Sequence, residues 1–135
     1  MSLRLLIVDD NAPFLVAATR ALEADGLHVV GIASTTAEAM ARQRELRPDV
    51  ILVDVNLGAE NGAELARLLT DPAMTGPNQV ILISTYPVQD LVDLVEALPG
   101  VGFLSKAQLS GSAIRQLIKK YQGRDADWPS ERPET

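Results

Sequence analysis

Short apolar runs alternate with amphipathic segments along most of the chain. The runs are rich in Val, Ile and Leu and are apolar on both faces, which is typical of strands in a parallel sheet covered by helices. They occupy Leu3–Val8, Val29–Ala33, Val50–Val55, Val80–Ile83 and Val101–Leu104. We therefore predict an α/β fold, with five parallel strands joined by right-handed helical crossovers in a doubly wound sheet.

The segments between these runs carry apolar residues at helical spacing. The clearest stripes are Phe14, Ala17, Ala18, Ala21 and Leu22; Val88, Leu91, Val92, Val95 and Leu98; and Ile114, Leu117, Ile118 and Tyr121. Helix-start signals agree: Asn11 and Ser110 are suitable N-caps, Thr35 with Glu38 forms a capping box, and Pro87 can open the fourth helix. The pattern predicts five βα units, (βα)5, in a single domain.

After Tyr121 the chain becomes polar, with two prolines and no periodicity in "QGRDADWPSERPET". We predict a folded domain over residues 1–121 and a flexible polar tail over residues 122–135. We favour a free tail over one in which Trp128 docks onto the domain.

Charge and composition narrow the range of functions. The net charge of −6 argues against a nucleic-acid surface, which would be basic. No apolar run approaches the ~18–20 residues that span a bilayer. The chain has no cysteine, so disulfides and cysteine metal sites are excluded. We expect a cytoplasmic protein that binds neither nucleic acid nor membrane directly.

Charged and hydroxyl side chains follow the predicted strands, at the edge where ligands of such sheets bind. The first strand is followed by Asp9–Asp10, the third ends at Asp54, the fourth runs into Ser84–Thr85 and the fifth into Ser105–Lys106. Clustered carboxylates repel one another and resist burial, so they need a positive partner. Lys106 supplies one charge, and a divalent cation would supply two. Oxygen ligands in a site that keeps waters suit Mg²⁺ better than Ca²⁺.

A carboxylate beside Mg²⁺ and a lysine can also act as a nucleophile. Asp54 could attack a phosphoryl group and form an acyl phosphate. Phosphoryl transfer depends mainly on positioning and charge neutralisation, which Lys106 and the Ser84 hydroxyl could assist. Gly58 and Gly62 would let the loop backbone approach the phosphoryl oxygens.

Four motifs stand in order at the strand ends: "IVDDN" (7–11), "ILVDVNLGAENG" (51–62), "ILIST" (81–85) and "GFLSK" (102–106). Together they resemble the receiver domains of two-component response regulators, over residues 3–121. The resemblance implies a flavodoxin-like strand order of 2-1-3-4-5. It also implies a signalling switch rather than a metabolic enzyme, one that catalyses its own phosphorylation and dephosphorylation at Asp54.

The resemblance further implies a metal site and a phosphoryl donor. A histidine kinase or a phosphotransfer protein would supply the phosphoryl group to Asp54. Mg²⁺ would be bound by Asp10 directly, by Asp9 directly or through water, by Asp54, and by the backbone carbonyl of Asn56. Lys106 would pair first with Asp54 and then with the phosphoryl oxygens.

The resemblance also implies a conformational response. Ser84 would move to bind the phosphoryl group, with Thr85 beside it, and the ring of Phe103 would turn inward. The change would reach the face formed by the fourth helix, the fifth strand and the fifth helix. That face would bind an output protein of unknown identity, or a second copy of the chain in a homodimer.

The chain departs from the family pattern at several positions. Ala107 follows Lys106 where the family usually has a proline after a cis bond. A cis bond before a non-proline residue costs ~2.5–4 kcal/mol, so we expect a trans bond. Gly58 should loosen the loop after Asp54, and Asn56 and Tyr86 should tune dephosphorylation.

Four alternatives compete with this function. A degenerate receiver that signals without phosphorylation, and a receiver cut from a longer transcriptional regulator, stay open as variants. A phosphohydrolase of the haloacid dehalogenase kind is disfavoured because Asn56 cannot serve as its general acid. An FMN carrier is disfavoured because Asp9 and Asp10 would repel the FMN phosphate.

Overall fold

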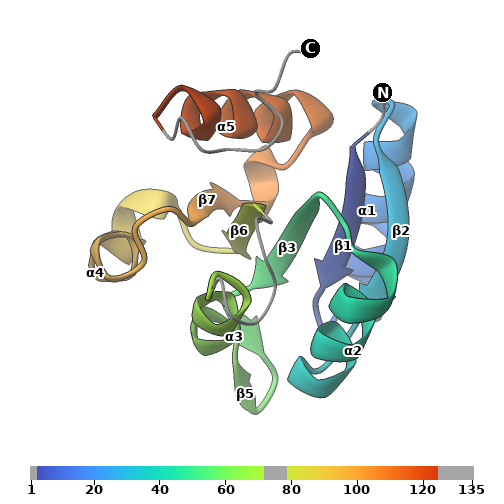
Figure 1. Ribbon diagram of the computed structural model, residues 1–135, viewed down its shortest axis with the longest axis horizontal. Helices are drawn as coiled ribbons and strands as arrows, with labels where there is room; N and C mark the ends of the chain where they lie inside the picture. The colour runs from blue at the N-terminus through green and yellow to red at the C-terminus, as the bar shows by residue number, and fades with distance from the viewer. Residues whose placement is uncertain (1–2, 72–78, 125–135) are drawn as a thin grey trace.

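A five-stranded parallel sheet forms the centre of the computed structural model, which describes residues 3–71 and 79–124 (Figure 1). The strand order is β2-β1-β3-β6-β7. The strands are β1 (Arg4–Val8), β2 (His28–Ala33), β3 (Val50–Asp54), β6 (Gln79–Ser84) and β7 (Gly102–Ser105). The predicted α/β fold and the order 2-1-3-4-5 are therefore confirmed. The end of the predicted tail, with Trp128, lies outside the described residues.

Helices cover both faces of the sheet. They are α1 (Ala12–Ala24), α2 (Thr36–Leu46), α3 (Gly62–Leu69), α4 (Val92–Ala97) and α5 (Gly111–Arg124), with short 3-10 turns η1 (Val88–Leu91) and η2 (Lys106–Gln108). One buried cluster joins α1 and α5 to one face of the sheet, and the other joins α2 and α3 to the opposite face. The helices of the described chain include none long and apolar enough to cross a membrane.

The predicted helix starts are largely those of the structure. Asn11 Oδ1 accepts a hydrogen bond from Phe14 N at 3.1 Å, and Ser110 Oγ accepts one from Ala113 N at 3.0 Å. Thr35 Oγ1 accepts from Glu38 N at 3.1 Å, which is half of the predicted capping box. The other half is displaced by one residue, because the Glu38 carboxylate accepts from the backbone N–H and the hydroxyl of Ser34.

The apolar stripe predicted for the fourth helix is wrong in part. Leu98 is buried, but Val92 and Val95 of that stripe are 51% and 37% exposed. The half-buried residues of this segment are Leu91 and Leu94, which lie at helical spacing with Leu98. The segment also begins as the 3-10 turn η1, which Pro87 opens, so its side chains do not follow one α-helical stripe throughout.

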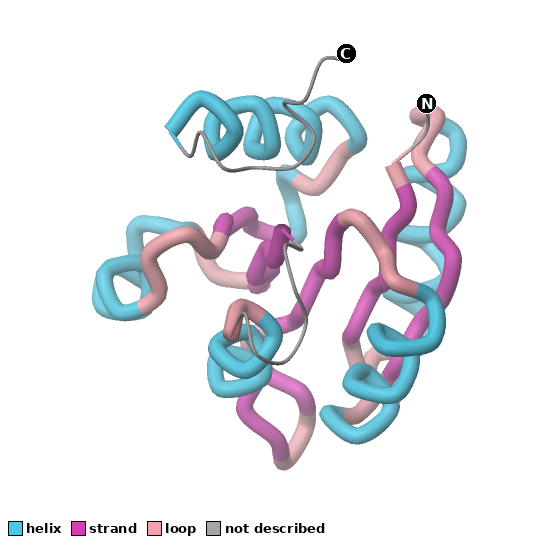
Figure 2. Tube along the Cα trace, viewed as in Figure 1, coloured by secondary structure: helices cyan, strands magenta, loops and turns pink. Residues whose placement is uncertain are grey.

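The segment after Asp54 forms a hairpin where we expected a loose loop. Its arms are β4 (Asn56–Leu57) and β5 (Glu60–Asn61), which project beside α3 in Figure 2. Gly58 turns the hairpin with a φ of 60°, a conformation that glycine adopts without strain. Glu60 Oε1 accepts a hydrogen bond from Thr36 N at 2.6 Å, so the hairpin is tied to the start of α2.

Gly62 lies where a side chain has no room. A Cβ atom at this position would stand 1.8 Å from the backbone oxygen of Asp54. We predict that Gly62→Ala lowers the free energy of unfolding by about 3 kcal/mol or more, because backbone rather than a side chain must move. Urea denaturation measures the loss. Gly100→Ala is the control. A Cβ atom at Gly100 would have no atom within 4 Å, so only the positive φ of 90° disfavours alanine there, at a cost of about 1–2 kcal/mol. Equal losses at the two positions would contradict the prediction.

Candidate functional site

Three carboxylates meet at the carboxyl edge of the sheet. Val8 of β1 lies opposite Val53 of β3, so the residues that follow them are neighbours. Asp9 and Asp10 come directly after β1, and Asp54 ends β3. One oxygen of each of these carboxylates lies within 4.8 Å of the others. The predicted strand-end cluster therefore exists as a compact group.

Local turns aim two of these carboxylates. Asp9 Oδ1 accepts a hydrogen bond from Asn11 N at 2.8 Å, and Asp54 Oδ1 accepts one from Asn56 N at 3.0 Å. Each carboxylate thus bonds the backbone two residues ahead, which is the pattern of an Asx turn. Asp9 is fully buried and Asp54 is buried, whereas Asp10 is exposed. The second oxygen of both buried groups is left facing the site.

Lys106, the first residue after β7, joins these two oxygens. Its Nζ lies 2.7 Å from Asp9 Oδ2 and 3.1 Å from Asp54 Oδ2. The same Nζ lies 4.2 Å from the centre of the Phe14 ring, over its face. Our sequence interpretation missed Phe14 as a site residue, because it assigned that ring to the apolar stripe of α1. Its place in the first turn of α1, at the same edge as Asp9, was the available signal.

Burial and charge shift the ionisation of the central pair. Burial raises the pKa of Asp54, and the neighbouring Asp9 charge adds to the rise, against hydrogen bonds from Asn56 N and Lys106. Burial alone would lower the pKa of Lys106. Its hydrogen bonds and charge contacts with Asp9 and Asp54 outweigh burial and raise that pKa. Lys106 therefore stays protonated at neutral pH.

The oxygen atoms of the site fit a hard divalent cation. Three carboxylates and one ammonium leave a formal charge of −2 (−3 + 1). Among the described residues, the contact of buried Asp9 Oδ2 is its ion pair with Lys106 Nζ at 2.7 Å. One ammonium leaves the cluster net negative, and oxygen ligands that carry excess negative charge suit a divalent cation. The triad is of the kind that holds Mg²⁺.

Ser84 ends β6 on the same edge. It is buried, and it is the next residue after Ile83, which lies opposite Asp54. Its Oγ accepts a hydrogen bond from Tyr86 N at 3.0 Å. Thr85 and Tyr86 are exposed beside it. No hydrogen bond within the described part of the chain joins Ser84 Oγ to Asp54.

The remaining predicted residues lie outside the group of three carboxylates and Lys106. Phe103 of β7 is half-buried and packs on the core cluster of the α2 and α3 face. Asn56 is exposed. A Cβ at Gly58 would stand 2.9 Å from Asp10 Oδ2, so that backbone lies close to the exposed carboxylate. The bond between Lys106 and Ala107 is trans, as expected.

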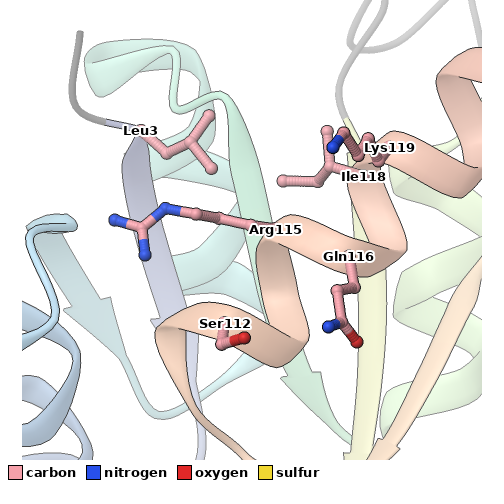
Figure 3. A pocket seen from close by; sticks show the side chains of 6 residues that line it. All are labelled: Leu3, Ser112, Arg115, Gln116, Ile118 and Lys119. Atoms are coloured by element: carbon pink, nitrogen blue, oxygen red, sulfur yellow. The ribbon is translucent and has the colours of Figure 1, made fainter.

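A separate hollow of about 350 Å³ lies away from this cluster (Figure 3). Its lining residues are Leu3, Ser112, Arg115, Gln116, Ile118 and Lys119. Leu3 precedes β1 and Asp9 follows it, so the hollow belongs to the opposite edge of the sheet. It takes no part in the site.

Comparison with known proteins decides the family. The model of the response regulator receiver domain matches residues 5–120. The chain belongs to the response regulator receiver domain family. A receiver domain with an aspartate cluster implies two-component signalling and a cognate histidine kinase.

Relatives of this receiver domain include longer proteins. It is 31% identical to protein-glutamate methylesterase/protein-glutamine glutaminase 1 of Methanosarcina acetivorans, over 95% of this chain and 38% of that protein. It is 29% identical to the probable transcriptional regulatory protein NarL of Mycobacterium tuberculosis, over 94% of this chain and 58% of that protein. Among the first relatives found, the chain spans about a third of each protein's length.

Solved receiver structures share the fold. The signal receiver domain of the response regulator NarL from Mycobacterium tuberculosis superposes with a TM-score of 0.73 at 27% identity. The match covers 90% of this chain and 98% of that chain. The sheet and the five helices are thus those of a receiver domain.

The raised pKa of Asp54 predicts how stability depends on pH. The folded state holds the Asp54 proton more tightly than the unfolded state, so this contribution to stability is lost as the pH rises through the folded pKa. In metal-free buffer at pH 7, Asp54→Asn should raise the free energy of unfolding by on the order of 1 kcal/mol. The gain should shrink toward pH 4. Urea denaturation at both pH values measures it, with the exposed Glu96→Gln as control. A less stable Asn variant at pH 7 would contradict the prediction.

Proposed function

We propose that this receiver domain is a switch operated by Mg²⁺-dependent phosphoryl transfer from a histidine kinase to Asp54. One observation carries the proposal: the buried Asp54 carboxylate lies 3.1 Å from Lys106 Nζ and within 4.8 Å of two further carboxylates. A purely structural aspartate has no need of this arrangement. We expect this phosphoryl transfer to take place in the cytoplasm.

The chemistry follows from the partners of Asp54. The hydrogen bond from Asn56 N holds Oδ1, and Oδ2, which accepts from Lys106 Nζ, is the oxygen that would attack phosphorus. Attack forms an O–P bond while the P–N bond to the donor histidine breaks, and the imidazole keeps the electron pair and takes up a proton. Lys106 balances negative charge on the transferring oxygens.

We assign the metal to Asp9, Asp10, Asp54 and the backbone carbonyl of Asn56. The bound ion would neutralise the charge of the acidic group and of the phosphoryl oxygens. The grouping of three carboxylates and the exposure of Asp10 support the assignment, because a site for Mg²⁺ must offer oxygens and remain open to water.

We propose that the switch passes through Ser84 to the face formed by α4, β7 and α5. Ser84 would leave Tyr86 N and bind the phosphoryl group, with Thr85 beside it, and Phe103 would turn inward. The α4 part of this face supports a role in binding, because it exposes Val92 and Val95. An output protein or a second copy of the chain would bind there and shift the equilibrium toward one state.

Phosphorylation is tested with a small-molecule donor. Acetyl phosphate with Mg²⁺ should add one phosphoryl group to the wild type, and Asp54→Asn should reduce labelling to background because the nucleophile is gone. Intact-protein mass spectrometry measures the mass change. Asp93→Asn, an exposed carboxylate on α4, is the control and should label as the wild type does. Equal labelling of the Asp54→Asn protein would remove Asp54 from the mechanism.

Lys106 is tested by separating metal binding from the switch. Lys106→Ala removes the one ammonium of the cluster, so Mg²⁺ should bind at least as tightly as to the wild type. Beryllofluoride should then cause far smaller chemical-shift changes on α4 and β7. NMR titration measures both effects, with Lys119→Ala on α5 as the control. A full response of α4 and β7 in the Lys106→Ala protein would refute the role of the lysine.

A further inference from the structure

Within residues 3–71 and 79–124, the Lys106 ammonium contacts two carboxylates and one aromatic ring. The two carboxylate contacts are with Asp9 and Asp54, and the ring of Phe14 presents its face at 4.2 Å. An ammonium has three N–H donors, so two carboxylate oxygens and one π face match its capacity. Cation–π attraction is strongest where water is limited, and the Lys106 side chain is only 14% exposed.

Phe14 is itself held by the residue that aims Asp9. Asn11 N donates to Asp9 Oδ1, while Asn11 Oδ1 accepts from Phe14 N. A single N-cap therefore fixes both the fully buried carboxylate and the first turn that carries the ring. Phe14 also packs half-buried against the core cluster beneath α1. The ring is a rigid surface, whereas a lysine side chain is flexible.

The segment that carries Lys106 is an exposed turn. Lys106 begins η2, and the two residues that follow it in this turn, Ala107 and Gln108, are exposed. A lysine side chain is flexible along its length, so the contacts at its tip set the place of the ammonium. Of the three contacts, the one with Asp54 changes when that carboxylate is phosphorylated, whereas those with Asp9 and Phe14 do not involve the reacting atoms.

We infer that Phe14 is a positioning residue that holds the Lys106 ammonium over the phosphorylation site through its aromatic face. It touches no reacting atom and acts through Lys106. The kinetic part of this inference rests on the proposed function, and the contact itself does not. Replacing the ring with an aliphatic side chain keeps apolar volume but lets the ammonium leave the line between Asp9 and Asp54.

The contact has a spectroscopic signature. Protons above an aromatic face are shifted upfield, so the Lys106 ε-methylene should be upfield of the other lysines in the wild type and in Phe14→Tyr. It should return to the ordinary lysine position in Phe14→Leu and Phe14→Met. Two-dimensional ¹H–¹³C NMR without phosphodonor measures these shifts. An unshifted wild-type resonance, or one unchanged by removal of the ring, would overturn the inference even if Asp54 is phosphorylated.

The kinetic arm uses acetyl phosphate at saturating Mg²⁺. Phe14→Leu should label about 2–30-fold more slowly, and Phe14→Tyr should stay within about twofold of the wild type. Leu22→Val is the matched control, since it shortens a buried side chain at the far end of α1. It should lower stability without changing the labelling rate or the Lys106 shift.

Equal slowing in Leu22→Val, or slow labelling in Phe14→Tyr, would show that Phe14 acts through packing alone. A wild type that takes no label would refute the proposed function, and the NMR arm would still judge the contact.

Discussion

Mutual repulsion among Asp9, Asp10 and Asp54 is the constraint on which the site depends. Folding brings the three carboxylates within 4.8 Å of one another, and two of them are buried. Neither burial nor like charge favours this cluster. Lys106 offsets part of the cost, and the remaining negative charge makes the site attractive to a cation and to a cation-bound phosphate. The repulsion that makes the cluster unfavourable for folding is thus also what makes the site bind a cation.

The fold could be predicted from the sequence because its central strands β1, β3 and β6 are apolar runs that are buried on both faces. The sheet order followed from the family resemblance and is that of the structure. The prediction failed at α4, where the apolar residues fit a continuous helix but a 3-10 turn comes first. It also missed the β4–β5 hairpin, whose arms have two residues each and show no periodicity.

The candidate site was predictable to the extent that parallel strands deliver their ends to one edge. That rule placed Asp9, Asp54 and Lys106 together from their positions in the sequence, but it gave no distances between their side chains. It could not assign Phe14, since an aromatic residue in an amphipathic helix is usually core, and here the ring packs on the core and contacts Lys106 as well. The roles of Ser84 and Phe103 depend on a second conformation and stay predictions.

The close approach of Gly62 to the Asp54 backbone oxygen has a directional consequence. Gly62 N also bonds Val55 O at 2.9 Å, and the adjoining hairpin is fastened to α2 through Glu60. The main chain between Asp54 and α3 is therefore held in place by these contacts. Toward the β6–β7 edge of the sheet, α4 has no buried residue among those described, so little packing opposes its displacement. A change in the backbone at Asp54 would therefore displace β6, β7 and α4 rather than the hairpin and α3.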